Sequence, residues 1–356
     1  MKLVTIGILA YNEERLIADT IASVFSQSVF GSDHSSRYRW QVVVLTNGCT
    51  DSTAAVAQTA VAAEQKKLPA TIELTAKFVD IPQPGKSNAW NLFVHSIADK
   101  ETEIFCFIDA DIEFINLNTI RSALACFETN ADVAVAVSMP LKRFPENSGR
   151  RLLKSISARV SKAKLETEPH HGICGQFYCG RASVLRNIWM PVGLSVEDGF
   201  LLAMAATDCF RKPPDLTRIV RAPEASHWYE GLTSFPAIMR HEERLVIGML
   251  LNCYLCWDTL TYLTPKSGDG AGKLIEQLNA DRPSWYQEMM QNAIAARGSW
   301  VIPNALLFRR FEQLKGEYFP KALARLPLVL ASTVVDWYVL FRVNRRMVTG
   351  RSVGFW

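Results

Sequence analysis

The chain has 356 residues, of which 49% are hydrophobic and 21% charged, and its formal net charge is +4. This composition is typical of a globular protein and excludes a disordered, collagen-like or low-complexity chain. The charge is too small to require a nucleic-acid partner, and the basic excess lies mainly in residues 301–356.

The first 140 residues alternate between strand and helix patterns. Short apolar runs rich in β-branched residues predict buried strands at residues 3–10, 41–46, 71–80, 104–108 and 133–138. Apolar residues at helical spacing predict helices at residues 13–27, 51–66, 86–98 and 117–129. This alternation predicts an α/β fold with a mostly parallel sheet and helices on both faces.

The second half of the chain is less regular up to about residue 230 and becomes helical after residue 235. Residues 150–166 are expected to form a basic amphipathic helix, and residues 196–207 a second helix. Eight cysteines are scattered singly, which favours buried, reduced thiols over a disulfide framework. The chain starts directly as a strand, without an apolar signal region, so we expect a cytoplasmic protein.

Polar residues follow the predicted strands where ligands of such sheets bind, beyond the carboxyl ends. The strongest signal is Asp109-Ala110-Asp111, two carboxylates just past a buried apolar run. A Mg²⁺ or Mn²⁺ ion bridging them to a diphosphate would offset the cost of burying these charges. The alternative is a solvated loop with a helix cap.

Three further features could carry chemistry. Glu197-Asp198 precedes an apolar helix pattern and is either an acidic helix start or a general base facing the metal site. Gly85-Lys86-Ser87 suits a phosphate at a helix start, although the full P-loop pattern is absent. His227 could supply a third metal ligand, or it could be a hydrogen-bonded loop histidine.

These motifs together resemble glycosyltransferase family 2. The run Ile-Gly-Ile-Leu-Ala-Tyr-Asn-Glu-Glu at residues 6–14 is similar to the opening of that family. It is followed in family order by residues 47–53, residues 85–91, Asp109-Ala110-Asp111 and Glu197-Asp198. The resemblance covers roughly residues 1–210. It implies a GT-A type, Rossmann-like fold and transfer of a sugar from a nucleotide diphosphate-sugar to a hydroxyl acceptor, with inversion at the anomeric carbon.

The resemblance also implies roles for single residues. Asp198 would be the catalytic base, supported by Glu197, and Asp111 would hold the metal together with Asp109. Nucleotide-sugar contacts would come from Ala10, Tyr11, Asn12, Glu13, Asn47, Lys86, Asp109 and Ala110.

Two departures from the family refine this expectation. Thr46-Asn47 stands where the family usually has two aspartates, so the nucleotide base is left open. The Q-x-x-R-W box of polymerising members is replaced by His-Glu-Glu-Arg-Leu at residues 241–245, which favours addition of a single sugar. We therefore expect an enzyme of envelope, glycolipid or polysaccharide synthesis with a saccharide or lipid-linked acceptor. The alternatives are a nucleotidyltransferase and a non-catalytic nucleotide-sugar-binding or membrane scaffold protein.

The expected domains are a catalytic domain at residues 1–235 and a helical region at residues 236–356. Within the first, residues 1–115 would bind the nucleotide-sugar and residues 116–235 the acceptor. Apolar stretches at residues 245–263 and 326–341 are interrupted by polar residues, and the second is shorter than the ~20 residues that span hydrocarbon.

These stretches form either a packed helical subdomain or a membrane-surface platform on the cytoplasmic face. In the second case Trp337, Tyr338 and Phe341 would sit at headgroup level. Anionic lipid would then meet a basic cluster formed by Arg342, Arg345, Arg346 and Arg351.

Overall fold

The computed structural model describes residues 1–31, 37–143, 172–232, 234–264, 268–314 and 319–350. In these residues, eight strands form one mixed sheet in the order β3-β2-β1-β4-β7-β6-β8-β5. The predicted helix at residues 150–166 and Arg351 lie outside the described residues.

One half of the sheet is parallel, as the sequence predicts. It consists of β1 (Lys2–Ala10), β2 (Tyr38–Asn47), β3 (Leu74–Ile81) and β4 (Thr102–Asp109). Almost every residue of β1 and β2 is buried, which is typical of strands covered on both faces. The parallel register aligns the carboxyl ends of these strands, so that Leu9 of β1 lies beside Asp109 of β4.

The other half is mixed, and the sequence analysis identified only one of its strands. It contains β5 (Ile112–Phe114), β6 (Val135–Arg143), β7 (Phe177–Arg181) and β8 (Ile219–Glu230). Strand β7 runs antiparallel to β4 and β6, whereas β8 runs parallel to β6 and antiparallel to β5. The register between β6 and β8 shifts around Pro223 and Glu224, where Glu224 has a φ of 56°. This bulge breaks the alternation by which a strand is recognised.

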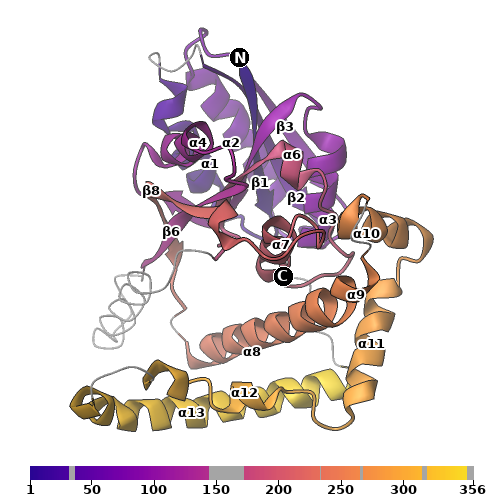
Figure 1. Cartoon of the computed structure of the whole chain (residues 1–356). Coiled ribbons are helices and arrows are strands. Elements are labelled where there is room, and N and C mark those ends of the chain that lie inside the picture. The colour runs from indigo at the N-terminus through magenta and orange to yellow at the C-terminus, as the bar shows by residue number, and fades with distance from the viewer. Residues whose placement is uncertain (32–36, 144–171, 233, 265–267, 315–318, 351–356) are drawn as a thin grey trace.

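Helices cover both faces of the sheet, as expected (Figure 1). One face packs against α1 (Ile17–Phe25), α2 (Thr53–Lys67) and α4 (Thr119–Thr129). The other face packs against α3 (Lys86–Leu92), its continuation η3 (Phe93–Ile97), α6 (Ala182–Leu185), α7 (Glu197–Ala206) and helices of the C-terminal region. Short 3₁₀ turns lie at η1 (Ser28–Phe30) and η4 (Leu216–Arg218).

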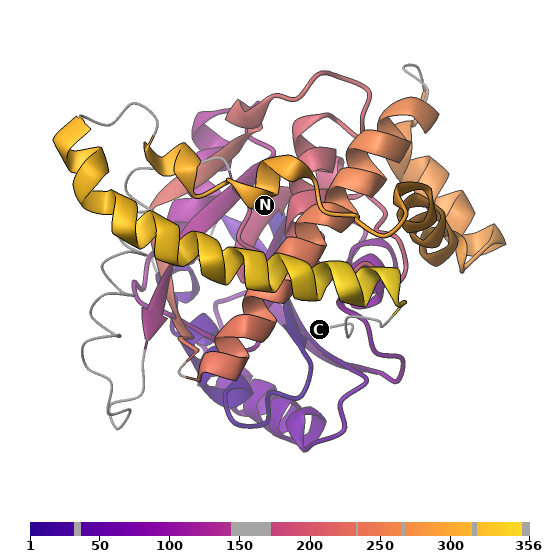
Figure 2. The same ribbon diagram turned by 90° about the horizontal axis from the view of Figure 1, so that it is seen from below.

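The C-terminal region is helical, as expected. Its elements are α8 (Phe235–Asn252), η5 (Cys253–Leu260), α9 (Thr261–Leu263), α10 (Gly270–Asp281), α11 (Trp285–Arg297), α12 (Asn304–Leu307), η6 (Phe311–Leu314) and α13 (Phe319–Val348). Figure 1 shows α8 below the sheet and α13 below α8, and Figure 2 shows α13 crossing α8 on the underside. The division into domains at residue 235 stays a prediction.

The close packing of α3 and η3 on the sheet depends on a glycine in β1. A Cβ atom at Gly7 would lie 2.6 Å from the ring of Phe93, which is fully buried. We predict that Gly7→Ala lowers the free energy of unfolding by about 1–3 kcal/mol, because the core must be overpacked or displaced. Chemical denaturation would measure this loss.

Two controls make the measurement specific. Gly172→Ala should leave stability nearly unchanged, since no atom lies within 4 Å of the added Cβ. Adding Phe93→Leu to Gly7→Ala should return part of the lost stability. If Gly7→Ala is as stable as the parent protein, the close contact between β1 and η3 is wrong.

Candidate active site

The carboxyl ends of β1 and β2 are joined by hydrogen bonds between their following loops. The Asn12 Oδ1 atom accepts from the backbone N–H of Thr50 at 2.8 Å, and the backbone N–H of Glu13 donates to Thr53 Oγ1 at 2.8 Å. Asn12 adopts a φ of 54°, in the left-handed region that asparagine tolerates better than most residues. The predicted residues 10–13 therefore form one loop held against the start of α2.

Lys86 connects two segments that are far apart in the sequence. Its Nζ atom lies 2.8 Å from Asp109 Oδ1 at the end of β4 and 2.7 Å from Glu197 Oε1 at the start of α7. The preceding residue, Gly85, has a φ of 133°, a backbone conformation that favours glycine and turns the chain into α3. The structure thus brings together three of the predicted residues in one largely buried ion-pair cluster, whose side chains are between 6% and 23% exposed.

Charge balance within this cluster shifts the pKa values of its members. Burial opposes ionisation of Glu197, but the Lys86 ammonium outweighs burial and holds the pKa of Glu197 below its usual value. Burial, together with Asp111, raises the pKa of Asp109 to about 6 despite the opposing effect of Lys86. Burial would lower the pKa of Lys86, but Asp109 and Glu197 raise it well above its usual value. Lys86 therefore stays protonated.

Asp198 follows Glu197 and lies against the backbone of Gly175. Burial and the charge of Glu197 raise its pKa, while a hydrogen bond from the Gly175 backbone acts in the opposite direction. A Cβ atom at Gly175 would lie 2.1 Å from Asp198 Oδ1, so only glycine fits at this position. A carboxyl group with a raised pKa beside other charged groups is the usual setting of a general base.

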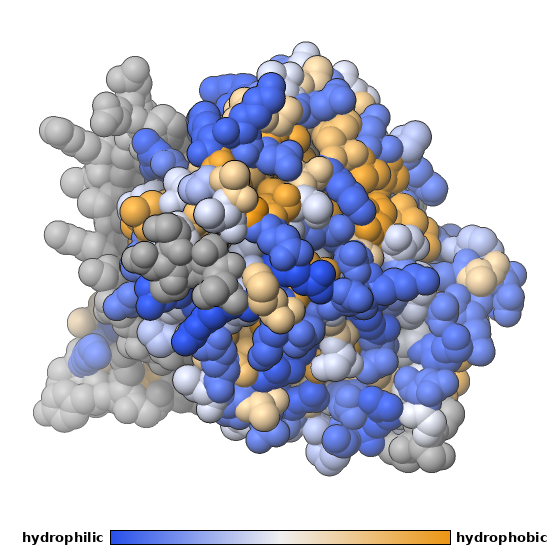
Figure 3. Space-filling model, turned by 90° about the horizontal axis from the view of Figure 1, so that it is seen from above, coloured by the Kyte–Doolittle hydropathy of each residue, from blue (hydrophilic) through white to orange (hydrophobic). Residues whose placement is uncertain are grey.

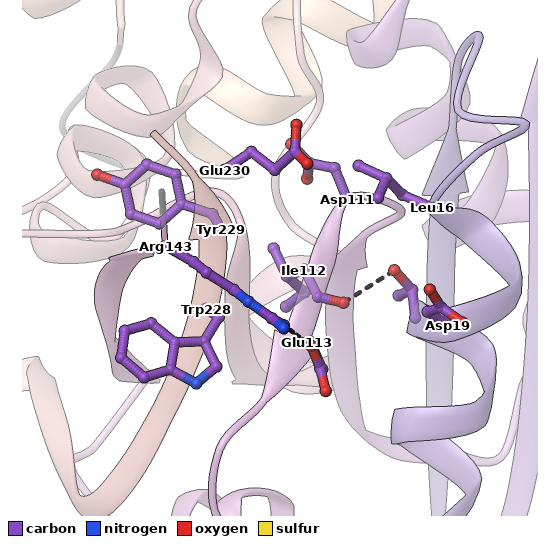
Figure 4. Close-up of a pocket in the computed structure, with 10 residues that line it drawn as sticks. Leu16, Asp19, Asp111, Ile112, Glu113, Arg143, Trp228, Tyr229 and Glu230 are labelled. Atoms are coloured by element: carbon purple, nitrogen blue, oxygen red, sulfur yellow. Dashed lines mark hydrogen bonds and ion pairs between the residues drawn. The ribbon is translucent and has the colours of Figure 1, made fainter. Parts of the chain in front are cut away.

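Asp111 lines a cavity of about 540 Å³ next to this cluster. Figure 4 shows Asp111 and Glu230 at the same end of the cavity, while Glu113 pairs with Arg143 lower in the view. The distance from Arg143 Nη1 to Glu113 Oε2 is 2.7 Å. The alignment of β5 with β8 explains this placement, because Ile112 pairs with Tyr229. Burial raises the pKa of Asp111, and Lys86 opposes this effect.

Glu13 faces the same group of carboxylates. Burial, followed by the charges of Asp111 and Asp109, raises the pKa of Glu13 to about 7. The donor set around Asp111 is therefore rich in carboxylate oxygens whose charges repel one another, and such oxygens are the ligands preferred by Mg²⁺ and Mn²⁺. Among the described residues, no group of three or more His, Cys, Asp or Glu side chains already has the geometry of a closed metal site.

Both ring nitrogens of His227 lie within hydrogen-bonding distance of protein side chains. Its Nδ1 atom lies 2.6 Å from Ser138 Oγ, and its Nε2 atom lies 3.2 Å from Gln176 Oε1. Burial lowers the pKa of His227 to about 4, so the ring is neutral near pH 7. Both ring nitrogens are thus engaged in the fold, and its role as a metal ligand stays a prediction.

The remaining predicted residues differ in exposure. Asn47 is fully buried, and its Nδ2 atom donates to the carbonyl of Gln83 at 2.5 Å. Ala10 and Ala110 are also buried, so any contact with a ligand would come from their backbone atoms. Tyr11 is half-buried at the end of β1. None of these placements tests the predicted contacts with a nucleotide.

Sequence reasoning missed three residues of the site. Gly175 supports Asp198, the carbonyl of Gln176 accepts from the backbone N–H of Asp109 at 2.9 Å, and Glu230 lies beside Asp111. The sequence signals this region only through the glycines at positions 172, 175 and 180. Because the sequence analysis did not identify β7 and β8, it could not place these residues next to the Asp109-Ala110-Asp111 motif.

The sequence matches the model of glycosyl transferase family 2 over residues 5–189, which is more than half of the chain. The match includes the loop after β1, Lys86 and the Asp109-Ala110-Asp111 motif. No protein of curated function matches the chain in sequence.

Solved structures show a similar fold. A mannosyltransferase from Pyrobaculum calidifontis, in complex with GDP-Man and Mn²⁺, is 17% identical, with a TM-score of 0.55 over 98% of this chain and 88% of that one. Glucosyl-3-phosphoglycerate synthase from Mycobacterium tuberculosis, in complex with Mn²⁺, UDP-glucose and phosphoglyceric acid, is 19% identical, with a TM-score of 0.44 over 71% of this chain and 80% of that one. The fold is thus of the GT-A type expected from the sequence.

Replacing Lys86 tests the buried ion-pair cluster. We predict that Lys86→Met lowers the free energy of unfolding at pH 7 by about 3–5 kcal/mol, because it leaves Asp109 and Glu197 buried without their cation. Without that cation, burial raises the pKa of both carboxyls above the unfolded values. The loss should therefore be largest above these raised pKa values and should shrink as the pH falls through them.

The matched control is Lys67→Met. Lys67 pairs with Glu64 at 2.6 Å on the exposed face of α2, and its loss should cost no more than about 1 kcal/mol. Denaturant unfolding at several pH values would compare the two variants. Equal and pH-independent losses would contradict a buried cluster at Lys86.

Proposed function

Because the chain belongs to glycosyltransferase family 2, we propose that it transfers a single sugar from a nucleotide diphosphate-sugar to a hydroxyl acceptor, with inversion at the anomeric carbon. The observation that carries this proposal is the position of Asp198. This carboxyl group has a raised pKa, is fixed by Gly175, and lies beside the Lys86–Asp109–Glu197 cluster. Such a group can hold a proton taken from a neutral hydroxyl near pH 7.

In the proposed reaction, the acceptor oxygen attacks the anomeric carbon from the face opposite the diphosphate. Asp198 takes the hydroxyl proton as the new carbon–oxygen bond forms. The bond from the anomeric carbon to the diphosphate oxygen breaks, and its electron pair leaves with the nucleoside diphosphate. Attack from the opposite face gives inversion.

The carboxylates at the acidic end of the cavity have the oxygen donors that a divalent cation prefers. Asp111 would hold the ion, and Asp109 and the neighbouring Glu230 would complete the site by rearrangement, since the described carboxylates do not form a closed metal site. The charge of the ion would offset the repulsion from Asp111 and Asp109 that adds to burial in raising the pKa of Glu13. When bound, the ion supplies a positive charge for the leaving diphosphate. Lys86 would keep Asp109 and Glu197 ionised and correctly oriented.

The proposed product carries one added sugar. Residues 241–245 lie on α8 and depart from the Q-x-x-R-W box, which supports single addition over polymerisation. We propose a saccharide or lipid-linked acceptor of envelope, glycolipid or polysaccharide synthesis, and a location in the cytoplasm or on the cytoplasmic face of a membrane. A thermal-shift screen of nucleotide-sugars with Mn²⁺ would identify the donor, since a ligand that binds only the folded state raises the melting temperature.

Asp198→Asn separates chemistry from binding. We predict at least a ~100-fold lower kcat with donor affinity unchanged, since the amide keeps the shape of the side chain but accepts no proton. Asp132→Asn, a change on an exposed loop, is the control and should leave kcat unchanged. An equal loss of donor affinity and rate would make Asp198 a donor-binding residue.

The pH profile gives a second test of the base. Burial and Glu197 raise the pKa of Asp198, so kcat should rise with pH until the carboxyl group is ionised and then level off. This acidic limb should disappear from the residual activity of Asp198→Asn. An unchanged acidic limb in the variant would assign the ionisation to another group.

Asp111→Asn tests the metal. We predict the loss of both Mn²⁺-dependent donor binding and transfer, while thermal unfolding changes little because the carboxylate lines a cavity. Glu113→Gln is the matched control, since Glu113 lines the same cavity but pairs with Arg143. If Asp111→Asn keeps full activity that a chelator does not reduce, the metal assignment is wrong.

A further inference from the structure

Helix α13 exposes a long apolar stripe. Its members are between 44% and 67% exposed: Leu328, Leu330, Val334, Val335, Trp337, Tyr338 and Phe341. Between residues 326 and 341, Asp336 is the only charged residue, and it is buried on the opposite face of the helix. An amphipathic helix of a globular protein normally turns a polar face outward, whereas α13 is apolar on its outer face as well as on its inner face, where Val339, Leu340 and Val343 are buried.

The inner face of α13 is fixed to the rest of the protein by polar contacts. Asp336 accepts from Arg309 Nε at 2.7 Å and from Arg310 Nε at 2.8 Å. Glu243 of α8 pairs with Arg342 and with Arg346. The orientation of the helix about its axis is therefore set, and the apolar stripe cannot rotate inward without breaking these buried ion pairs.

The stripe lies on one side of the molecule. In Figures 1 and 2, α13 forms the lowest layer and crosses α8 from outside. The opposite side, in Figure 3, is covered mostly by hydrophilic residues, with hydrophobic residues in patches between them. Contiguous exposed apolar surface of this kind marks an interaction site.

We propose that the stripe docks α13 flat onto the surface of an anionic lipid bilayer. Trp337 and Tyr338 would lie at headgroup level, and the aliphatic members would reach the acyl boundary. The sequence around the helix is basic as a whole, because residues 301–356 carry nine Lys or Arg and three Asp or Glu. This net positive charge suits anionic headgroups.

The charge pattern argues against a second copy of the chain as the occupant. A second copy would bring the same excess of nine Lys or Arg over three Asp or Glu in residues 301–356 against its own. Like net charges oppose that arrangement, whereas an anionic membrane meets the excess with negative charge.

The contacts of α13 also argue against a transmembrane orientation. Helices at residues 235–263 and 321–348 are long and apolar enough to span a membrane, with mean hydropathies of 1.2 and 1.5. Spanning would carry Asp336, Glu243 and their arginine partners into hydrocarbon, where charges are costly. A helix lying in the interface keeps these groups inside the protein.

The structure reduces the charge that the predicted basic cluster offers to anionic lipid. Arg342 and Arg346 both pair with Glu243, so three arginines and one glutamate leave a net charge of +2 at this end. Apolar contact should therefore carry most of the affinity. Salt should weaken binding without abolishing it.

Docking on this side would bring the membrane toward the proposed active site. Helix α8 lies between α13 and the segment that carries Asp198, and a Cβ atom at Gly248 of α8 would be 2.5 Å from Val196. On the basis of the proposed function, this position favours a lipid-linked acceptor over a soluble one. The docking itself does not depend on that activity.

Flotation of the full-length protein with vesicles tests the docking without any substrate. We expect the protein to float with vesicles of equal phosphatidylglycerol and phosphatidylcholine, and much less with phosphatidylcholine alone. The variant Val334→Ser/Val335→Ser/Phe341→Ser should lose at least ~10-fold in vesicle affinity at an unchanged melting temperature, because these side chains are exposed. Arg345→Glu should weaken binding more at low salt than at high salt.

The matched control is Ile115→Ser/Leu117→Ser, which removes exposed apolar residues next to α4, away from α13. This variant should float like the parent protein. Failure of the parent protein to float with anionic vesicles would overturn the proposal. Flotation of the triple variant equal to that of the parent would overturn it too, as would equal binding to neutral vesicles. A dimer in sedimentation experiments that only the triple variant abolishes would assign the stripe to a second copy of the chain.

Discussion

The architecture of the site depends on one largely buried cation, the ammonium group of Lys86. Lys86, at the start of α3, binds a carboxylate at the end of the parallel half of the sheet and another at the start of α7. An ammonium group and two carboxylates out of water are tolerated only when they satisfy one another. This requirement fixes the end of β4, the start of α3 and the start of α7 relative to one another. Asp198, the second residue of α7, lies beside these charged groups.

The mixed half of the sheet supplies what the parallel half cannot. Strand β7 runs against β4, so the residues just before it, Gly175 and Gln176, return to the carboxyl end of β4. Strand β8 brings Glu230 beside Asp111. Helix α8 then packs on α7 and connects this centre with α13, whose outer face is apolar. The proposed chemistry and the proposed surface attachment would thus lie on adjacent layers of the protein.

The parallel strands and the DxD motif could be predicted because their signals are local: uninterrupted apolar runs, followed by polar residues at the strand ends. Strand β8 could not, since Pro223 and the left-handed Glu224 break its alternation. Gly175 carries no chemistry of its own, and its importance comes only from contact with Asp198. The pairing of Arg342 and Arg346 with Glu243 likewise comes from tertiary packing. The sequence alone predicted that these two arginines would face lipid together with Arg345 and Arg351.

In the proposed reaction, this environment prepares Asp198 to accept a proton. Its carboxyl pKa can be measured directly by ¹³C NMR of the metal-free protein labelled at aspartate, with the spectrum of Asp198→Asn to assign the signal. We expect a titration midpoint well above the ordinary aspartate value of 3.8, because burial and the neighbouring Glu197 raise the pKa of Asp198. A midpoint at or below 3.8 would contradict this expectation.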